Sequence, residues 1–204
     1  GIHYVTINLL ASALFLIGLG MIYGSVGSLN MVDVGRILPT LDDDQHKLAI
    51  AGGLLLFVVF GIKAAMLPVG FWLPKTYAVA STPVAAIFTI MTKVGIYAIL
   101  RVNGTVFDDA MAQSIFKNTL LLIGLITSIY GVIGAIAAER LRRFVGFMVL
   151  SSVGTLLIAI AMFNTQAWSA GLVYLVHSTL IAAAFYLFCG WITAQRGMFK
   201  DHLK

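Results

Sequence analysis

The chain of 204 residues is 60% hydrophobic and only 10% charged, and its formal net charge at pH 7 is +5. Soluble domains carry about 25% charged residues, so this composition excludes an ordinary water-soluble globular protein and predicts an all-α polytopic membrane protein. The positive charge does not indicate a nucleic-acid partner, because the basic residues are scattered over short connections and form no basic stripe.

Apolar segments long enough to cross a bilayer, about 20 residues each, follow one another along the chain. We expect six membrane-spanning helices, near 3–24, 47–70, 82–103, 117–138, 143–163 and 168–194. Between them, only 25–46 and 104–116 are long enough to carry structure of their own. The first of these connections predicts a short surface helix around Met31–Leu38, followed by the acidic run Asp42–Asp44 in a solvated loop.

Lysine and arginine are unevenly divided between the two sides of the predicted bundle. One side carries seven basic residues: Lys75, Arg140, Arg142, Arg143, Arg196, Lys200 and Lys204. The other side carries four: Arg36, Lys47, Arg101 and Lys117. Because short cytoplasmic connections are enriched in lysine and arginine, we expect the side with seven, which includes both ends of the chain, to be cytoplasmic.

The second apolar segment contains two prolines, Pro68 and Pro74. Proline lacks a backbone N–H and clashes with the carbonyl four residues earlier, so we expect this helix to kink or break near residue 64. Backbone carbonyls freed at membrane depth are tolerated where they are buried in protein or line a watery cavity, and broken helices of this kind recur in transporters. The break would offer hydrogen-bond partners to Lys63.

Two lysines, Lys63 and Lys93, lie deep inside apolar spans that contain no acidic residue. A charge at the bilayer centre costs about 2.5–3.5 kcal/mol on insertion scales, and such residues typically face a protein interior or a path for ions or protons. Lys93 lies roughly 15 Å from either interface at about 1.5 Å per residue, too far to snorkel readily. Because burial disfavours the charged amine, we expect each lysine to exchange protons, with an acidic partner outside this sequence. The alternative for Lys93 is a structural ion pair with another segment, and the alternative for Lys63, which lies nearer the cytoplasmic end of its span, is snorkelling to the membrane surface.

His177, near the middle of the last span, is the third candidate, because histidine titrates closest to physiological pH and suits a proton relay. The alternative is a neutral histidine hydrogen-bonded to a neighbouring helix. The other histidines, His3, His46 and His202, lie at membrane edges or in the tail, and no pair has metal-ligand spacing. We therefore expect no metal site and no cofactor. Because the sequence contains no nucleophile motif, we also expect a transporter subunit and not an enzyme.

Three smaller features complete the pattern. Gly20 and Gly24 form a small-xxx-small pair, which is typical of close helix packing in membranes. The single cysteine, Cys189, lies in an apolar run, where we expect a buried small side chain. The chain begins at Gly1 without a basic region before its first apolar segment, so this segment is not a signal peptide, and we expect the chain to be a piece of a longer polytopic protein.

The residues around the two lysines resemble a known family. The run Gly61 to Pro68, the motif Phe71-Trp72-Leu73-Pro74 and the run Thr92 to Arg101 are similar to the core of antiporter-like membrane subunits. Bacterial multisubunit Na⁺/H⁺ antiporters (the Mrp, Mnh or Pha type) and respiratory complex I share these subunits. Residues 93–101 and 142–152 resemble the D subunit of the Mrp type most closely, and the resemblance covers essentially the whole chain.

The resemblance implies a full subunit of about fourteen helices that contains two inverted repeats. This chain would supply the sixth to eleventh helices. Residues from about 1 to 103 would form the end of the first repeat, and residues from about 117 to 204 would form the start of the second. Proton translocation would fall to Lys63, Lys93 and His177. The family's fifth-helix glutamate and twelfth-helix charged residue would lie outside this chain, in keeping with the missing acidic partner.

Two positions depart from the family's pattern. Lys75 stands where an acidic residue often follows Trp-Leu-Pro, which suggests that this position is not essential to transport. Residues 181–184 read Ile-Ala-Ala-Ala where some members carry a lysine. That difference leaves His177 to carry any relay through the last helix.

By resemblance, the chain belongs to a proton-translocating subunit of an electrogenic Na⁺/H⁺ antiporter in a bacterial plasma membrane. Its partners would be the other subunits of the complex and membrane lipid, and its ions would be protons and Na⁺. Two alternatives remain at this point. One is a proton-pumping subunit of complex I or of a membrane-bound hydrogenase, and the other is a non-conducting scaffold whose lysines pair with neighbouring chains.

Overall fold

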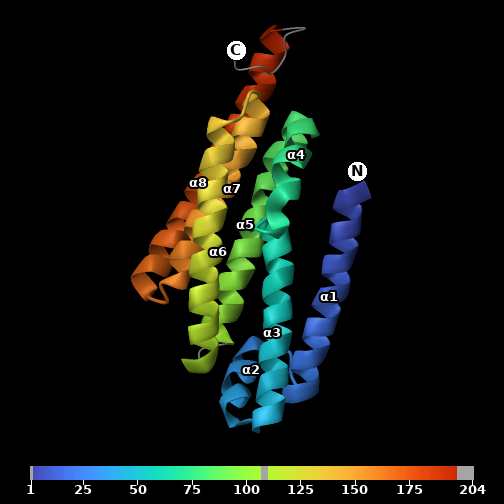
Figure 1. The fold of residues 1–204 in the computed structure, drawn as a ribbon, viewed down its shortest axis with the longest axis vertical. Helices are drawn as coiled ribbons and strands as arrows, with labels where there is room; N and C mark the ends of the chain where they lie inside the picture. The colour runs from blue at the N-terminus through green and yellow to red at the C-terminus, as the bar shows by residue number, and fades with distance from the viewer. Residues whose placement is uncertain (1, 107–109, 197–204) are drawn as a thin grey trace.

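The structure, a computed structural model, describes residues 2–106 and 110–196, without the side chains of residues 2–4, 103, 105, 110–115 and 196. Within this part of the chain every regular element is a helix (Figure 1). Six spans are long and apolar enough to cross a membrane: α1 (Ile2–Val26), α3 (Asp43–Ala64) with α4 (Trp72–Val79), α5 (Thr82–Thr105), α6 (Ala110–Ile136), α7 (Leu141–Ala161) and α8 (Thr165–Arg196). The all-α fold and the number of spans are confirmed.

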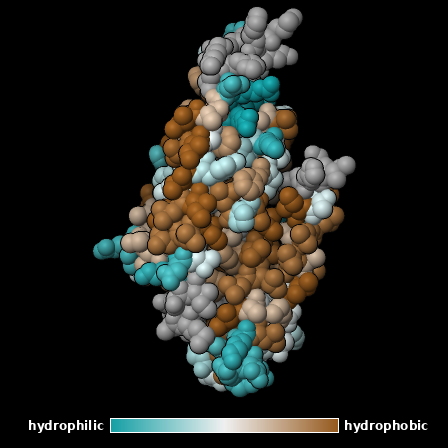
Figure 2. All heavy atoms as spheres, viewed as in Figure 1, coloured by the Kyte–Doolittle hydropathy of each residue, from teal (hydrophilic) through white to brown (hydrophobic). Residues whose placement is uncertain are grey.

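The long helices lie side by side along one axis (Figure 1). The turn from α4 to α5 and the turn from α6 to α7 lie at one end of the bundle, and α2 (Met31–Ile37) lies at the other. Figure 2 shows hydrophobic residues across the middle of one face and hydrophilic residues towards both ends. This banding is the pattern that a bilayer requires of a multi-pass protein.

The first long connection contains α2 and a 3-10 turn, η1 (Leu38–Thr40), so the predicted short helix is confirmed. The side chain of Asn30 caps α2 by accepting a hydrogen bond from the backbone N–H of Val32 at 3.0 Å. Asparagine is among the preferred residues at this position because it satisfies an N–H that the helix leaves unpaired.

The prediction of a solvated loop for Asp42–Asp44 was wrong for the backbone of Asp43 and Asp44 and correct for the exposure of all three side chains. α3 begins at Asp43, so Asp43 and Asp44 occupy its first turn, and Asp42 is the residue that precedes it. Carboxylates are stabilised at a helix N-terminus because the macrodipole is positive there. All three side chains are exposed, and Asp43 forms an ion pair with Lys47 one turn along the helix.

Glycines allow α6 and α7 to pack closely. A Cβ added to Gly131 would lie 2.5 Å from the backbone nitrogen of Ser151, and a Cβ added to Gly154 would lie 2.4 Å from that of Ser128. Small residues at such positions let two helix backbones approach closely, and the helices then make extensive van der Waals contact with each other. The contact fixes the face of α7 that points towards α5.

The predicted packing pair on α1, Gly20 and Gly24, does not bring α1 against another helix of the described residues. A Cβ added to Gly20 or Gly24 would meet no atom of the described residues within 4 Å. The glycines that bring α1 against α3 are Gly18 and Gly52, since an added Cβ on either would lie 3.0 Å or less from the other's carbonyl oxygen. Spacing alone does not tell which face of a helix meets its neighbour.

Burial separates inner from outer helices. In the second span and in α7, 67% and 61% of the apolar window is buried, whereas in α1 and α8 only 17% is buried. The outer helices therefore present apolar side chains to lipid or to other helices. Cys189 is fully buried on the inner side of α8, which confirms the small buried role predicted for it.

Candidate functional site

The second span is interrupted between α3 and α4, which confirms the predicted broken helix. α3 ends at Ala64, Ala65 adopts the left-handed conformation with a φ of 60°, and a 3-10 turn, η2 (Val69–Phe71), leads into α4. Pro68 lies inside the break, and Pro74 lies in the first turn of α4, where a helix has no acceptor for the missing N–H.

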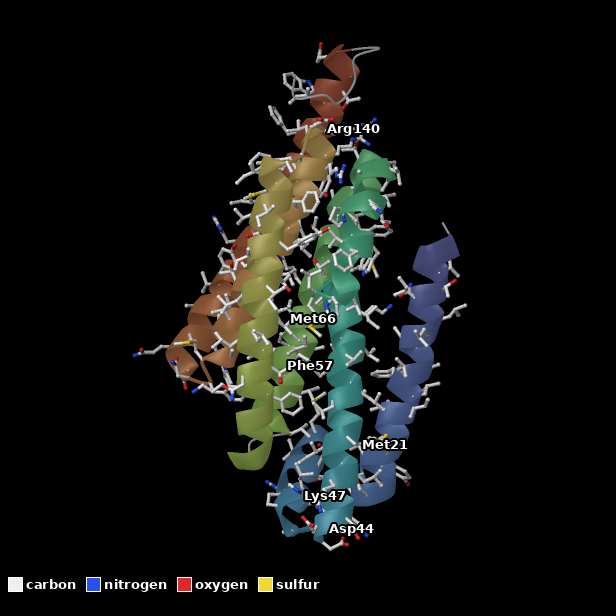
Figure 3. The ribbon with its side chains drawn as sticks, viewed as in Figure 1. Met21, Asp44, Lys47, Phe57, Met66 and Arg140 are labelled. Carbon is white, nitrogen blue, oxygen red and sulfur yellow. The ribbon has the colours of Figure 1, made fainter. Side chains whose placement is uncertain are left out.

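The break lies at mid-depth of the bundle. Figure 3 places Met66, one of its residues, midway between Lys47 near one end and Arg140 near the other. Non-helical backbone at this depth is stable only where its polar groups are paired or meet water. The partners of these groups are therefore part of the site.

Side chains from two elements pair with the interrupted backbone. The indole N–H of Trp72 donates to the carbonyl of Ile62 at 3.2 Å. The backbone N–H of Leu67 donates to the hydroxyl oxygen of Thr127 on α6 at 3.1 Å. Trp72 and Thr127 therefore stabilise the break from α4 and from α6.

Two glycines let the backbone approach the break. A Cβ added to Gly70 would lie 1.9 Å from the carbonyl oxygen of Ala65, and a Cβ added to Gly95 of α5 would lie 2.8 Å from the nitrogen of Ala64. Glycine is the residue that permits such close contact. Gly95 lies two positions from Lys93, so the end of α3 abuts the part of α5 that carries this lysine.

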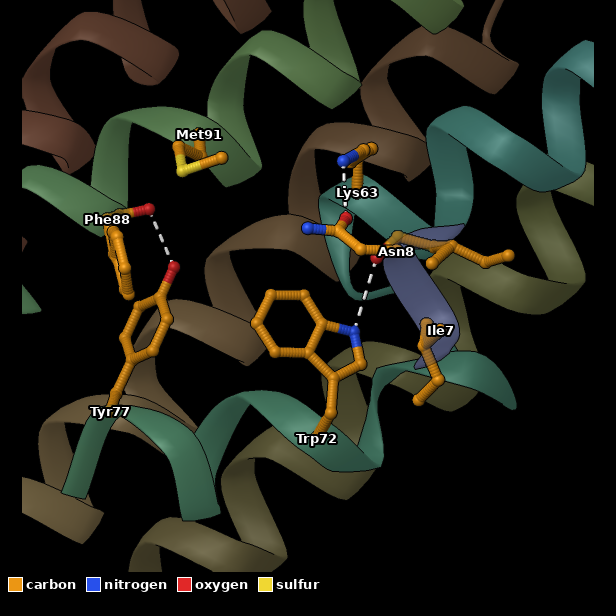
Figure 4. A pocket seen from close by; sticks show the side chains of 8 residues that line it. Ile7, Asn8, Lys63, Trp72, Tyr77, Phe88 and Met91 are labelled. Atoms are coloured by element: carbon orange, nitrogen blue, oxygen red, sulfur yellow. Dashed lines mark hydrogen bonds between the residues drawn. The ribbon is translucent and has the colours of Figure 1, made fainter. Parts of the chain in front are cut away.

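Lys63 is the last residue but one of α3 and is half-buried. Its amine donates to the side-chain oxygen of Asn8 on α1 at 2.5 Å (Figure 4). Both residues line a pocket of about 20 Å³, which Trp72, Tyr77 and Met91 also border. The C-terminal end of a helix favours a cation because the macrodipole is negative there, so the amine has a neutral acceptor and a favourable helix end.

Lys93 lies near the middle of α5, and only 2% of its surface is exposed. Its amine donates to the hydroxyl oxygen of Ser152 on α7 at 2.5 Å. Ser152 in turn donates to the carbonyl of Val149 at 2.7 Å. A hydroxyl compensates a buried positive charge far less than a carboxylate would. A buried amine with a neutral partner is an arrangement suited to losing and regaining a proton.

His177 lies on α8, and its side chain is exposed. It lines a cavity of about 280 Å³ between α7 and α8, together with Tyr174 and Ser178. Ser152 borders the same cavity. The structure thus brings Lys93, Ser152 and His177 into one region, whereas Lys63 lies in a separate pocket.

Three polar partners do not emerge from sequence reasoning: Asn8, Thr127 and Ser152. Asn8 carries a signal, because an amide inside an apolar span is costly unless it is hydrogen-bonded. Serine and threonine carry none, since in membrane helices they readily bond carbonyls of their own helix. Only the packing of the helices reveals that Ser152 faces Lys93 and that Thr127 faces the backbone of the break.

Histidines and acidic residues form no metal-binding group in the described part of the chain. In residues 2–106 and 110–196, no three His, Cys, Asp or Glu side chains are grouped so that they could hold a metal ion. The side chains of His3 and His202 lie outside the described residues. Lys75, the residue that departs from the family's pattern, is exposed on α4, beside a surface pocket that Glu139 and Arg143 also line.

Comparison with known proteins gives consistent matches along the chain. The profile of a family described as "NADH:quinone oxidoreductase/Mrp antiporter, TM" matches residues 1–203. A Rhizobium meliloti protein named as a probable K⁺/H⁺ antiporter D subunit is 43% identical over 205 residues, covering 100% of this chain and 38% of that protein. The Na⁺/H⁺ antiporter D subunit of Bacillus subtilis is 33% identical over 203 residues, covering 98% of this chain and 40% of that protein.

The fold also matches a solved assembly. A chain in the structure of the Mrp complex from Dietzia sp. aligns with a TM-score of 0.82 and 33% identity, covering 93% of this chain and 34% of that one. The chain therefore spans about two-fifths or less of the relatives it matches.

Proposed function

Because this chain belongs to the NADH:quinone oxidoreductase/Mrp antiporter membrane family, we propose that it is part of a proton-translocating subunit of a monovalent cation/proton antiporter. Protons would pass along a hydrated path at mid-membrane depth through Lys63 and Lys93, and His177 would extend that path across α8. The partners would be other subunits of the complex, as for the relatives named as antiporter D subunits, with lipid against the exposed apolar faces of α1 and α8.

The observation that carries this proposal is the surroundings of Lys93. Its side chain is 2% exposed, and its amine is hydrogen-bonded to a neutral hydroxyl. A purely structural lysine at this depth would be expected to pair with a carboxylate, which offsets the cost of burial. An amine held by a neutral hydroxyl has no carboxylate bound to it among the described residues, so it can release its proton and accept one again when an anionic group or a proton source comes near.

The orientation in the membrane and the division into repeats belong to the same proposal. Lys75, Arg140 and Arg143 lie at the end of the bundle opposite α2. By the excess of basic residues there, we place that end at the cytoplasmic side of a bacterial plasma membrane. The first repeat would end at about residue 103 and the second would begin at about residue 117, so the division falls at the connection between α5 and α6.

The identity of the cation is a matter for direct measurement. The two relatives compared above are named for different ions, K⁺ in one and Na⁺ in the other. We therefore propose that the antiporter exchanges an alkali cation, with Na⁺ as the first candidate. NaCl and KCl are added in parallel assays at equal ionic strength. The salt that dissipates a preformed pH gradient identifies the exchanged cation.

The experiment uses the complete antiporter complex in everted membrane vesicles, with cation-dependent proton flux as the readout. Lys93→Ala and Lys63→Ala are compared with Lys75→Ala, a control because Lys75 is exposed on α4. We expect both buried-site variants to lose flux while the control retains it. Unchanged flux in assembled Lys93→Ala complexes would overturn the proposal.

The family's description also includes NADH:quinone oxidoreductases, so a subunit of a redox-driven proton pump is the second candidate. Purification of the native complex separates the two functions. Co-purified antiporter subunits support the first, and co-purified flavin or iron–sulfur subunits, with flux that requires an electron donor instead of a cation gradient, support the second. Loss of assembly in the lysine variants, with no change in flux per assembled complex, would instead indicate a scaffold.

A further inference from the structure

Ser152 stands between a buried amine and a cavity. It is itself 9% exposed, and its hydroxyl oxygen accepts a hydrogen bond from Lys93 while its proton points to the carbonyl of Val149 at 2.7 Å. On its other side Ser152 borders the cavity of about 280 Å³ that His177 also lines. Ser152 is thus the residue through which Lys93 meets that cavity.

The cavity can hold water. A water molecule needs roughly 10–15 Å³ of such volume and two to four polar partners, and 280 Å³ exceeds that volume roughly twentyfold. Polar groups of Ser152, Tyr174, His177 and Ser178 border it, among apolar side chains of α7 and α8. Water in the cavity would therefore gather along the polar residues that lead from Ser152 to His177.

We propose that the hydroxyl of Ser152 is a proton relay between the amine of Lys93 and water in this cavity, on the side of His177. The proposal rests on the proposed function above, because it assumes that Lys93 exchanges protons. It adds a residue on α7 to the path, and it sets the direction in which Lys93 delivers its proton.

The transfer balances as a concerted exchange of two protons. An N–H bond of the Lys93 ammonium breaks as a new O–H bond forms on Ser152. The original O–H bond of Ser152 breaks as its proton passes to a cavity water, which becomes hydronium. Lys93 is left as a neutral amine and Ser152 is again a neutral hydroxyl, and the reverse sequence reloads the lysine.

The hydroxyl has two orientations available to it, because a serine O–H rotates to suit its partners. With its proton on the Val149 carbonyl, Ser152 accepts from Lys93 but donates nothing to the cavity. With its proton turned to the cavity, the same oxygen still accepts from Lys93 and completes the path. Rotation of one bond therefore connects and disconnects the amine.

The test compares four variants in the complete complex: Ser152→Ala, Ser152→Thr, Ser152→Cys and the control Ser151→Ala. Ser151 is the neighbouring serine on α7, and it faces Gly131 of α6. Flux is normalised to the amount of assembled complex and is measured in H₂O and in D₂O. We expect Ser152→Ala to lower flux about tenfold or more, the lower end of what a positioned proton-transfer group contributes, and Ser152→Thr to restore most of it.

The isotope effect separates a relay from a group that only holds Lys93 in place. If Ser152 relays protons, its removal makes proton transfer limiting, so the H₂O/D₂O ratio of flux rises in Ser152→Ala. If Ser152 is only structural, assembly falls while flux per complex and the isotope ratio stay at wild-type values, and the proposal is overturned. Should Ser152→Ala fail to assemble, Ser152→Cys takes its place, because its thiol fits the same space but is a weak hydrogen-bond acceptor for the Lys93 amine and a weak donor to water; a raised isotope ratio supports the relay and a wild-type ratio with wild-type flux overturns it.

The two proposals fail in different ways. Wild-type flux per complex in Ser152→Ala, together with lost flux in Lys93→Ala, would reject the relay and leave the proposed function standing. Wild-type flux in Lys93→Ala would reject the proposed function itself. Equal losses in Ser151→Ala and Ser152→Ala would assign the effect to the packing of α7 on α6 and would also reject the relay.

Discussion

The two lysines occupy contrasting sites although both lie at membrane depth. Lys93 sits within an intact helix, is 2% exposed and donates to the hydroxyl of Ser152. Lys63 sits at the end of an interrupted helix, is half-buried and donates to the amide of Asn8. The first site depends on a side-chain hydrogen bond from α5 to α7, and the second depends on a break in the backbone.

The difference shows two physical ways to keep an amine in a membrane. At Lys63 the helix end supplies a favourable dipole and an outer helix supplies a polar side chain, so the charged form has support. At Lys93 the helix is regular, its carbonyls are used within it, and support comes from the hydroxyl of Ser152. We therefore expect Lys93 to be the more sensitive position for proton transfer and Lys63 the more sensitive to the geometry of the break.

The largest effect is expected from Lys93→Met. Methionine nearly matches the length of lysine without its charge, and replacing a buried charged group by a packed apolar one is often neutral or stabilising. We expect normal assembly and thermal stability, with proton flux reduced by about a hundredfold or more, as for loss of a proton-transfer group. Lys63→Met serves as the matched variant and is expected to lose less flux, and a larger loss there would reverse the comparison.

Gly70→Ala is expected to have the next largest effect, on stability. The added Cβ would lie 1.9 Å from the Ala65 carbonyl oxygen, so the backbone of the break must shift. Overpacking of this kind costs about 3 kcal/mol at the upper end of its usual range. Gly20→Ala is the control, because an added Cβ there meets nothing in the described residues within 4 Å. The stability of both variants is measured as the thermal midpoint of the detergent-solubilised complex. Equal midpoints for Gly70→Ala and Gly20→Ala would contradict the role given to Gly70.

The two lysines, His177 and the helix break can be singled out from the sequence, because each is an exception to the pattern of an uninterrupted apolar helix. A charge in an apolar helix and a proline five residues after Lys63 are local signals, read without knowing the fold. The same reasoning fails for the acidic run, because Asp43 and Asp44 can either end a loop or begin a helix, and only the position of α3 decides. It does not identify Gly18, rather than Gly20 and Gly24, as the glycine of α1 that meets α3, because spacing does not give the direction in which a helix face points.

The polar partners of the lysines and of the interrupted backbone are the least predictable part of the site. Ser152 and Thr127 become visible only when α6 and α7 are packed, since a hydroxyl in an apolar helix commonly bonds its own backbone. Ser152 in fact does both, donating to Val149 while it accepts from Lys93. Asn8 is more readily found, because an amide in a membrane span needs a partner.

Asn8→Ala tests the support of Lys63 from α1. Its removal takes away the acceptor at 2.5 Å from the lysine amine. A hydrogen bond to a charged group contributes about 1.5–3 kcal/mol, so we expect the thermal stability of the complex to fall by about 2 kcal/mol and proton flux to fall by less than in Lys93→Met. Ser12→Ala is the control on the same helix, because Ser12 is exposed and donates to the backbone carbonyl of Asn8. If the two changes lower stability and flux equally, the loss comes from a general disturbance of α1 and not from the hydrogen bond between Asn8 and Lys63.

Thr127→Val is expected to have the smallest effect and sharpens the comparison from the side of α6. Valine keeps the shape of threonine but cannot accept the hydrogen bond that Leu67 N–H donates at 3.1 Å. A buried N–H left unpaired costs about 1–3 kcal/mol, and we expect the lower end because the interrupted backbone has freedom to adjust. Thr127→Ser, which keeps the hydroxyl, should restore the stability that Thr127→Val loses. A double variant tests which lysine the break supports. If it supports Lys63 and not Lys93, Thr127→Val should lower flux in a complex that keeps Lys63, but should lower it no further in a complex that already carries Lys63→Met. A further loss of flux in the double variant would mean that Thr127 acts on the Lys93 side, and the two sites would no longer be separable.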